Sequence, residues 1–245
     1  MKITQVEPQK TLRLRSGRRR FNVFLDGEFA FGADEDLVVS ERLVSGKIID
    51  ENDLNHLIEE AEMGKLMEKM YGLFSIRQRS EREVRDYLKN LSFKRKLKDQ
   101  DEISSLAIDQ LIEKLKKKEM LNDSEFAKAW VEGRRRSKQK SIRALKMELM
   151  KKGIGREVIE EVLRLADARS GSSIFQSEED LAGKALEKKM RVWKSLPRPE
   201  FKKKAISYLM RQGFDYSLIK NLVENVLKKE YTGYSEIKDS YEDDF

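Results

Sequence analysis

The sequence predicts a mainly α-helical chain of tandem three-helix modules, preceded by a small extension that contains a β-hairpin. Three observations predict this fold class. An internal repeat recurs at an offset of sixty positions, helical periodicity with polar caps continues from residue 51 onward, and strand-like alternation is confined to the first fifty residues. The repeated residues are Leu149, Gly153, Val158, Ile159, Val162 and Leu163, which recur as Leu209, Gly213, Leu218, Ile219, Leu222 and Val223.

Residues 1–50 are expected to form the β-containing extension. Apolar residues alternate in Ile3–Val6 and again in Phe21–Phe31, and Asp26-Gly27 is a turn signal that predicts a hairpin. The segment between them is basic, which is compatible with an exposed strand edge or with phosphate contact. Its cations are Lys10, Arg13, Arg15, Arg18, Arg19 and Arg20.

Residues 51–120 are expected to form the first helical module. A short helix carrying Leu37 precedes it and ends near Gly46, and a longer helix follows the cap at Asp50. Ser80 to Glu83 is a capping-box pattern that opens the next helix. A charged connection then leads to a helix whose apolar residues run from Ile108 to Leu115.

Two further three-helix modules are expected over residues 121–168 and 177–230. In each of them a polar cap opens the first helix, at Asn122 to Glu125 and at Ser177 to Asp180, and a glycine suited to a left-handed bend ends the second. These glycines are Gly153 and Gly213. The Ser- and Gly-containing stretch after Ala168 reads as a linker, and residues 231–245 read as an acidic disordered tail.

The charge balance points to an anionic partner. Of the 245 residues 39 % are charged, and the net charge is +7. The last fifteen residues carry five carboxylates and one lysine, a balance of −4, so the body before them is about +11 by subtraction. Such a body attracts nucleic acid, although a merely well-solvated surface has the same composition. We expect a cytoplasmic protein, since the sequence has no cysteine, no membrane-spanning run and no signal peptide.

The sequence lacks the residues of common catalytic sites. It contains one histidine, His56, on the polar side of its helix, and no cysteine, so the usual triads and transition-metal clusters cannot be built. Asp34-Glu35-Asp36 is explained by a helix start, and no glycine-rich phosphate loop is present. We therefore predict a protein without catalysis or cofactor, with a carboxylate-based magnesium nuclease as a formal alternative.

A dense positive cluster spans the first two helices of the middle module. Helical geometry places Lys140, Arg143 and Lys151 on the side away from the apolar face, with Met147 among them. This basic face suits phosphates or an acidic groove on a protein, and a solvated face remains an alternative. The full cluster is Arg134, Arg135, Arg136, Lys138, Lys140, Arg143, Lys146, Lys151 and Lys152.

Four segments resemble the RecX family, whose members regulate the RecA recombinase. The most specific is Met120–Ala127, with its Leu-Asn-Asp and Phe-Ala pairs, and Ser75–Leu88 is similar to the family's opening signature. Leu145–Ile154 and Gln212–Phe214 resemble the turns that follow the second helices, and Phe29–Gly32 is reminiscent of an extended N-terminus found in some members. Gln78, Ser141 and Ile142 depart from the pattern, where the family commonly has proline, glycine and proline.

The resemblance implies tandem modules that lie in the groove of the RecA filament on single-stranded DNA and modulate recombination, DNA repair and the SOS response without chemistry of their own. Expected partners are RecA and single-stranded DNA, with double-stranded DNA left open, and the expected state is a monomer without a membrane role. The candidate RecA or DNA contacts are Arg77, Arg79, Arg134, Arg135, Lys138, Lys140, Arg143, Lys151 and Lys152. A RecA-independent, basic DNA-binding helical protein is the competing hypothesis.

Overall fold

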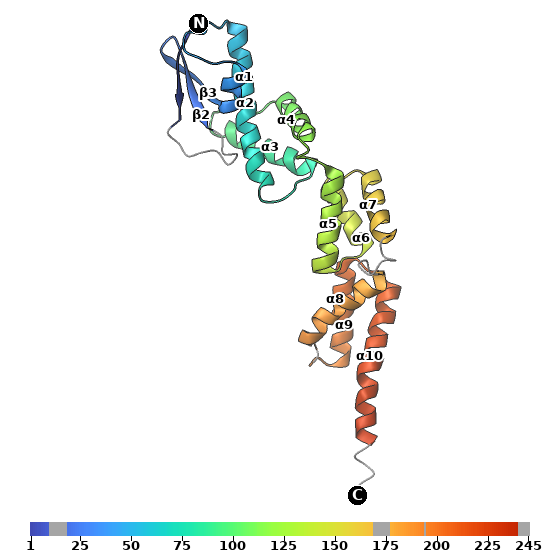
Figure 1. The fold of residues 1–245 in the computed structure, drawn as a ribbon. Helices are drawn as coiled ribbons and strands as arrows, with labels where there is room; N and C mark the ends of the chain where they lie inside the picture. Colours follow the sequence, from blue (N-terminus) through green and yellow to red (C-terminus); the bar gives the residue numbers. More distant parts are fainter. Residues whose placement is uncertain (10–18, 169–176, 194, 240–245) are drawn as a thin grey trace. The chain divides into compact units, whose positions relative to one another are not determined.

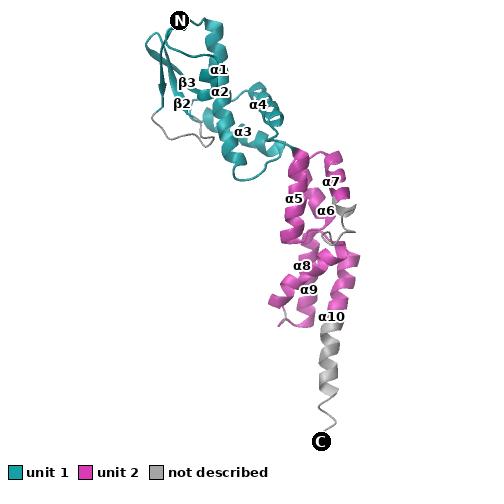
Figure 2. Cartoon of the chain, in the orientation of Figure 1, with its two compact units in different colours: residues 1–122 teal, residues 123–245 magenta. Residues whose placement is uncertain are grey.

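The computed structural model describes residues 1–9, 19–168, 177–193 and 195–239, and its chain divides into two compact units, residues 1–122 and 123–245 (Figures 1 and 2). The described residues of the first unit form a sheet and four helices. They are β1 (Ile3–Pro8), β2 (Arg20–Leu25), β3 (Glu28–Asp34), α1 (Glu35–Ser40), α2 (Glu51–Phe74), α3 (Glu81–Lys96) and α4 (Ser105–Lys117). The fold class predicted from the sequence, mainly helical with a small β-containing start, is confirmed.

The predicted hairpin is part of a three-stranded antiparallel sheet in the order β1-β2-β3. Asp26 and Gly27 form the tight turn between β2 and β3, and both have positive φ angles, 49° and 95°. Arg20 Nη2 donates to the carbonyl of Gly32 across the hairpin at 3.0 Å. Most of the basic segment singled out in the sequence, Lys10 to Arg18, lies outside the described residues.

Helix α2 belongs to two cores. Its first half buries Leu57 and Ala61 against the sheet, where Ile3, Val23 and Ala33 are fully buried. Its second half buries Leu66 and other apolar residues against α3 and α4. The sheet and the first helical module are therefore joined by one continuous helix, and a border at residue 50 in the sequence is not a border between separate cores. The capping box that starts α2, between Asp50 and Asp53, holds the beginning of this helix.

The described residues of the second unit form six helices in two sets of three. They are α5 (Asp123–Lys138), α6 (Ile142–Lys151), α7 (Arg156–Ala168), α8 (Glu178–Trp193), α9 (Arg198–Gln212) and α10 (Tyr216–Asp239). Each set surrounds its own core, one containing Leu149 and Ile159, the other Leu209 and Ile219 at the positions sixty residues further on.

The repeat extends to the backbone at the glycine that follows the second helix of each set. Gly153 ends α6 with a φ of 80°, and Gly213 ends α9 with a φ of 91°, as the sequence predicts for both. The end expected for the last helix near Lys229 is wrong. Helix α10 continues to Asp239. The predicted linker over residues 169–176 and the end of the tail, 240–245, lie outside the described residues.

Candidate interaction surface

A polar joint connects the two helical sets of the second unit. Its members are Gln139, Ser141, Glu178, Lys188 and Gly213. Ser141 is only 1 % exposed, and its Oγ caps α6 by accepting from the backbone N–H of Ala144 at 3.1 Å. The backbone N–H of Ser141 in turn donates to the carbonyl of Gln212, at 3.2 Å.

Two side chains of α8, Glu178 and Lys188, complete this polar joint. Glu178 Oε1 of α8 accepts from the backbone N–H of Ile142 at 2.7 Å, and Lys188 Nζ donates to Gln139 Oε1 at 3.0 Å. At the start of α6, the backbone N–H groups of Ser141 and Ile142 are thus satisfied by groups of the third module, and that of Ala144 by the Ser141 cap. The departure from the family pattern at Ser141 and Ile142 therefore coincides with a built contact, in which the serine supplies the cap.

Glu148 of α6 organises the buried side of the basic cluster. Its Oε1 lies 2.6 Å from Lys140 Nζ, and its Oε2 accepts from Arg134 Nε and from Trp130 Nε1, both at 2.9 Å. Burial would raise the pKa of the Glu148 carboxyl, but the hydrogen bonds from Lys140 and Trp130 and the nearby cationic charges outweigh burial and hold its pKa below the ordinary value. The carboxylate therefore stays charged and neutralises part of the cluster.

The indole ring of Trp130 contacts two cationic side chains and one aromatic ring. The guanidinium of Arg134 lies 4.3 Å from the centre of the indole ring, Lys152 Nζ lies 5.0 Å from it, and Phe126 stacks on the ring at 5.6 Å. Arg134, Lys140 and Lys152 thus support the interior of the module. They are half-buried and less available for an external partner than the sequence pattern suggests.

Arg135 is placed differently from the expectation of a surface contact, because it is only 9 % exposed. It follows Ala127 and Val131 at intervals of four residues, so it lies on the apolar face of α5. That spacing was the signal that could have identified it as a core position. Its aliphatic stem fills space that an apolar residue would otherwise occupy.

Arg77 and Arg79 lie in the other unit, immediately before α3. Arg77 forms a two-bond ion pair with Glu83, at 2.8 and 3.0 Å, which fixes the start of α3 beside the Ser80 cap. Arg79 is half-buried. The ion pair with Glu83 therefore gives Arg77 a structural role.

The cations that remain exposed are Lys138, Arg143 and Lys151, together with Arg136 of the same cluster. Arg143 and Lys151 lie on α6. The same helix exposes two methionine side chains, Met147 at 54 % and Met150 at 43 %. Polarizable thioethers beside cations are typical of protein-binding surfaces. We call Arg143, Met147, Met150 and Lys151 the α6 face.

Helix α9 repeats the α6 face, which the sequence reasoning missed although the sixty-residue offset contained the signal. Lys203 corresponds to Arg143, Met210 to Met150, and Arg211 to Lys151, and all three are exposed. Lys203, Met210 and Arg211 form the α9 face. The second unit therefore carries two related surfaces on equivalent helices.

Among the described residues, no group of three or more His, Asp or Glu side chains could hold a metal ion, and no described helix is long and apolar enough to cross a bilayer. His56 is exposed on α2, as expected from its position. The fold defines a class of modular helical protein, built from tandem three-helix sets behind a small sheet.

Comparison with known proteins identifies the family. Residues 1–50, 122–163 and 177–223 match the family models described as regulatory protein RecX N-terminal domain, RecX second three-helix domain and RecX third three-helix domain. A regulatory protein RecX from Bacillus subtilis is 31% identical over 224 residues, which cover 91% of this chain and 76% of the relative. The chain belongs to the RecX family.

Other relatives extend over nearly the whole chain. Regulatory protein RecX from Listeria welshimeri is 27% identical over 281 residues, covering 94% of this chain and 99% of the relative. A crystal structure of regulatory protein RecX superimposes with a TM-score of 0.60 at 22% identity, covering 91% of this chain and 98% of the other. This last likeness supports the fold.

Proposed function

We propose that this protein binds RecA filaments on single-stranded DNA and modulates recombinase activity, in the direction of inhibition, without catalysis of its own. The observation that carries the proposal is the pair of equivalent exposed faces on α6 and α9 in a chain of the RecX family. A filament presents the same surface many times, and a duplicated face matches such a partner. The protein acts in the cytoplasm as a monomer without a cofactor, and its effects extend to DNA repair, recombination and the SOS response.

Among the sequence-predicted candidates, the geometry favours Lys138, Arg143 and Lys151 as contacts, since their side chains reach solvent. Arg134, Lys140 and Lys152 have structural partners around Glu148 and Trp130, and they act by holding the module in shape. Arg77 and Arg79 stay candidate contacts of the first unit, with the Arg77 pair to Glu83 as a competing use.

The test is DNA-dependent ATP hydrolysis by RecA, measured with the regulator added at amounts well below one per RecA protomer. We expect a progressive loss of hydrolysis and of strand exchange. An unchanged rate even with excess regulator would contradict the proposal. Magnesium-dependent cleavage of DNA in the absence of RecA would instead support the nuclease alternative.

A RecA-independent DNA-binding function is favoured by one observation, the net charge of +7. Titration of the protein on bare single-stranded and double-stranded DNA distinguishes the two functions. Tight, salt-sensitive DNA binding together with an unaffected RecA filament would support the second function.

A further inference from the structure

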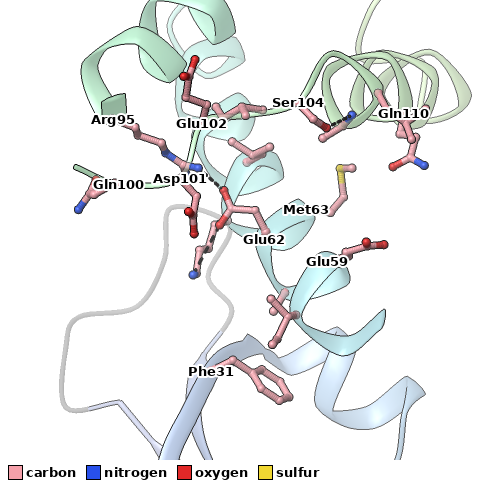
Figure 3. Close-up of a pocket in the computed structure, with 17 residues that line it drawn as sticks. Phe31, Glu59, Glu62, Met63, Arg95, Gln100, Asp101, Glu102, Ser104 and Gln110 are labelled. Atoms are coloured by element: carbon pink, nitrogen blue, oxygen red, sulfur yellow. Dashed lines mark hydrogen bonds and ion pairs between the residues drawn. The ribbon is translucent and has the colours of Figure 1, made fainter. Parts of the chain in front are cut away.

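The first unit contains an open pocket at the junction of its two cores, which the function proposed above does not use. The pocket has a volume of about 630 Å³. Its lining extends from the sheet, along the middle of α2, to the α3–α4 connection (Figure 3). This volume is within the range of pockets that hold small ligands or single anchoring side chains. We call it the junction pocket.

The walls of the junction pocket are partly apolar. Phe31 lines its sheet end and Ile103 the end formed by the α3–α4 connection, and both are buried. Two other apolar side chains that line it reach solvent, Ile58 of α2 at 43 % and Leu106 of α4 at 66 % exposure. Leucine and isoleucine exposed beside a cavity offer a contact surface for the carbon chain of a ligand.

The charged side chains around the pocket are mostly acidic. Among the described residues that line it, four carry carboxylates, Glu59, Glu62, Asp101 and Glu102, against two cations, Lys65 and Arg95. The balance of −2 is opposite in sign to the chain as a whole, which carries +7.

Both cations form ion pairs with the same carboxylate, that of Glu62. Arg95 Nη1 lies 2.6 Å from Glu62 Oε1, and Lys65 Nζ lies 3.6 Å from Glu62 Oε2, and Figure 3 shows Arg95 and Glu62 directed toward one another. Glu102 is paired with Lys96 at 2.7 Å, outside the pocket lining. Among the described residues, Glu59 and Asp101 take part in no ion pair, and both side chains are exposed.

An apolar wall with uncompensated carboxylates is complementary to an arginine or lysine side chain. The aliphatic stem of such a side chain covers apolar surface while its charged end meets carboxylates. We propose that the junction pocket binds an arginine- or lysine-bearing apolar segment of a partner protein. This site is separate from the faces on α6 and α9, and it provides the first unit with a partner contact of opposite charge.

The probe for this site is the capped peptide acetyl-Leu-Arg-Leu-Arg-amide, titrated into the full-length protein and followed through the methyl NMR signals of Ile58, Ile103 and Met63. We expect saturable shifts at these methyl groups, weakened as salt is raised from about 50 to 500 mM because the contact is partly ionic. The matched peptide acetyl-Leu-Gln-Leu-Gln-amide should bind at least about fivefold more weakly.

Variants then locate the site. The double change Glu59→Gln and Asp101→Asn should weaken binding of the arginine peptide about tenfold, and Leu106→Ser about threefold. The matched control, Glu132→Gln with Glu187→Gln, removes the same charge from exposed positions of the second unit and should leave binding unchanged. Circular dichroism melts check that the variants stay folded.

The proposal is overturned by any of three results. They are no methyl shifts at millimolar arginine peptide, equal binding of the glutamine peptide, and equal weakening by the control pair. None of these outcomes depends on RecA, so failure of the junction pocket is distinguishable from failure of the proposed filament function.

Discussion

Gly213 lies against the cap of α6 so closely that a Cβ atom at position 213 would be 2.6 Å from Ser141 Oγ and 2.7 Å from the Cβ of Ala144. The bend that ends α9 is therefore also a contact surface for the preceding module. A glycine is required here twice, once for its φ of 91° and once for the space that it leaves.

Replacing this glycine should reveal both requirements. We expect Gly213→Ala to lower the free energy of unfolding of the second unit by about 2–4 kcal/mol, through backbone strain and overpacking at the polar joint. Gly46→Ala is the matched control, since Gly46 has a similar φ of 96° but no atom within 4 Å of an added Cβ. It should lose only about 1–2 kcal/mol. Urea unfolding measures both, and equal losses would show that the contact with Ser141 has no energetic role.

A second glycine, Gly64 of α2, lets the side chain of Asp34 lie close to the backbone of that helix. Gly64 of α2 faces Asp34, whose carboxylate caps α1, and an added Cβ would lie 2.5 Å from Asp34 Oδ2. Glycine to alanine in a helix usually gains about 0.5–1 kcal/mol, which we expect for Gly133→Ala, where the space is open. Gly64→Ala should instead lose about 1 kcal/mol in the same urea measurement. A gain at both positions would mean that Asp34 moves aside without cost.

The Glu148 cluster predicts an acid-sensitive contribution to stability. In the folded protein the pKa of the Glu148 carboxyl lies below its ordinary value of 4.5, because the charged form is stabilised there. This stabilisation of the fold is therefore complete above pH 4.5 and is lost as the pH falls through the folded pKa. We expect Glu148→Gln to lower the free energy of unfolding by about 1–2 kcal/mol at pH 7. The difference between the variant and the natural protein should shrink as the pH falls below 4.5. A difference that is constant with pH would contradict the role of the charge.

The exposed cations of the α6 face are expected to act in binding and not in folding. Arg143→Glu with Lys151→Glu should weaken association with RecA filaments at least about tenfold, while the melting temperature changes little. Arg156→Glu with Arg164→Glu, which reverses two exposed charges on α7, is the control for net charge. Filament co-sedimentation and thermal melts measure the two properties. A parallel loss of stability and association would indicate a folding role for the face.

Local signals in the sequence predicted most of the fold. The Asp26-Gly27 turn, the caps at Asp50 and Ser80, and the bends at Gly153 and Gly213 depend on residues close together in the chain, and the structure confirms them. Such features follow from turn and cap chemistry that acts over four residues or fewer.

The candidate surface was predicted less completely, because exposure of a cation depends on partners distant in sequence. Lys140 and Arg134 are bound by Glu148, which a count of charges along the chain does not reveal. Arg135 could have been placed from its spacing to Val131, since helical periodicity applies to charged residues as well as to apolar ones. The α9 face could likewise have been read from the repeat.

The continuity of helix α2 links the stability of the two cores of the first unit. One uninterrupted helix contributes Leu57 to the core against the sheet and Leu66 to the core shared with α3 and α4. A substitution that breaks α2 near its middle therefore removes apolar contacts from both cores at once, so the sheet and the first helical module should lose stability together.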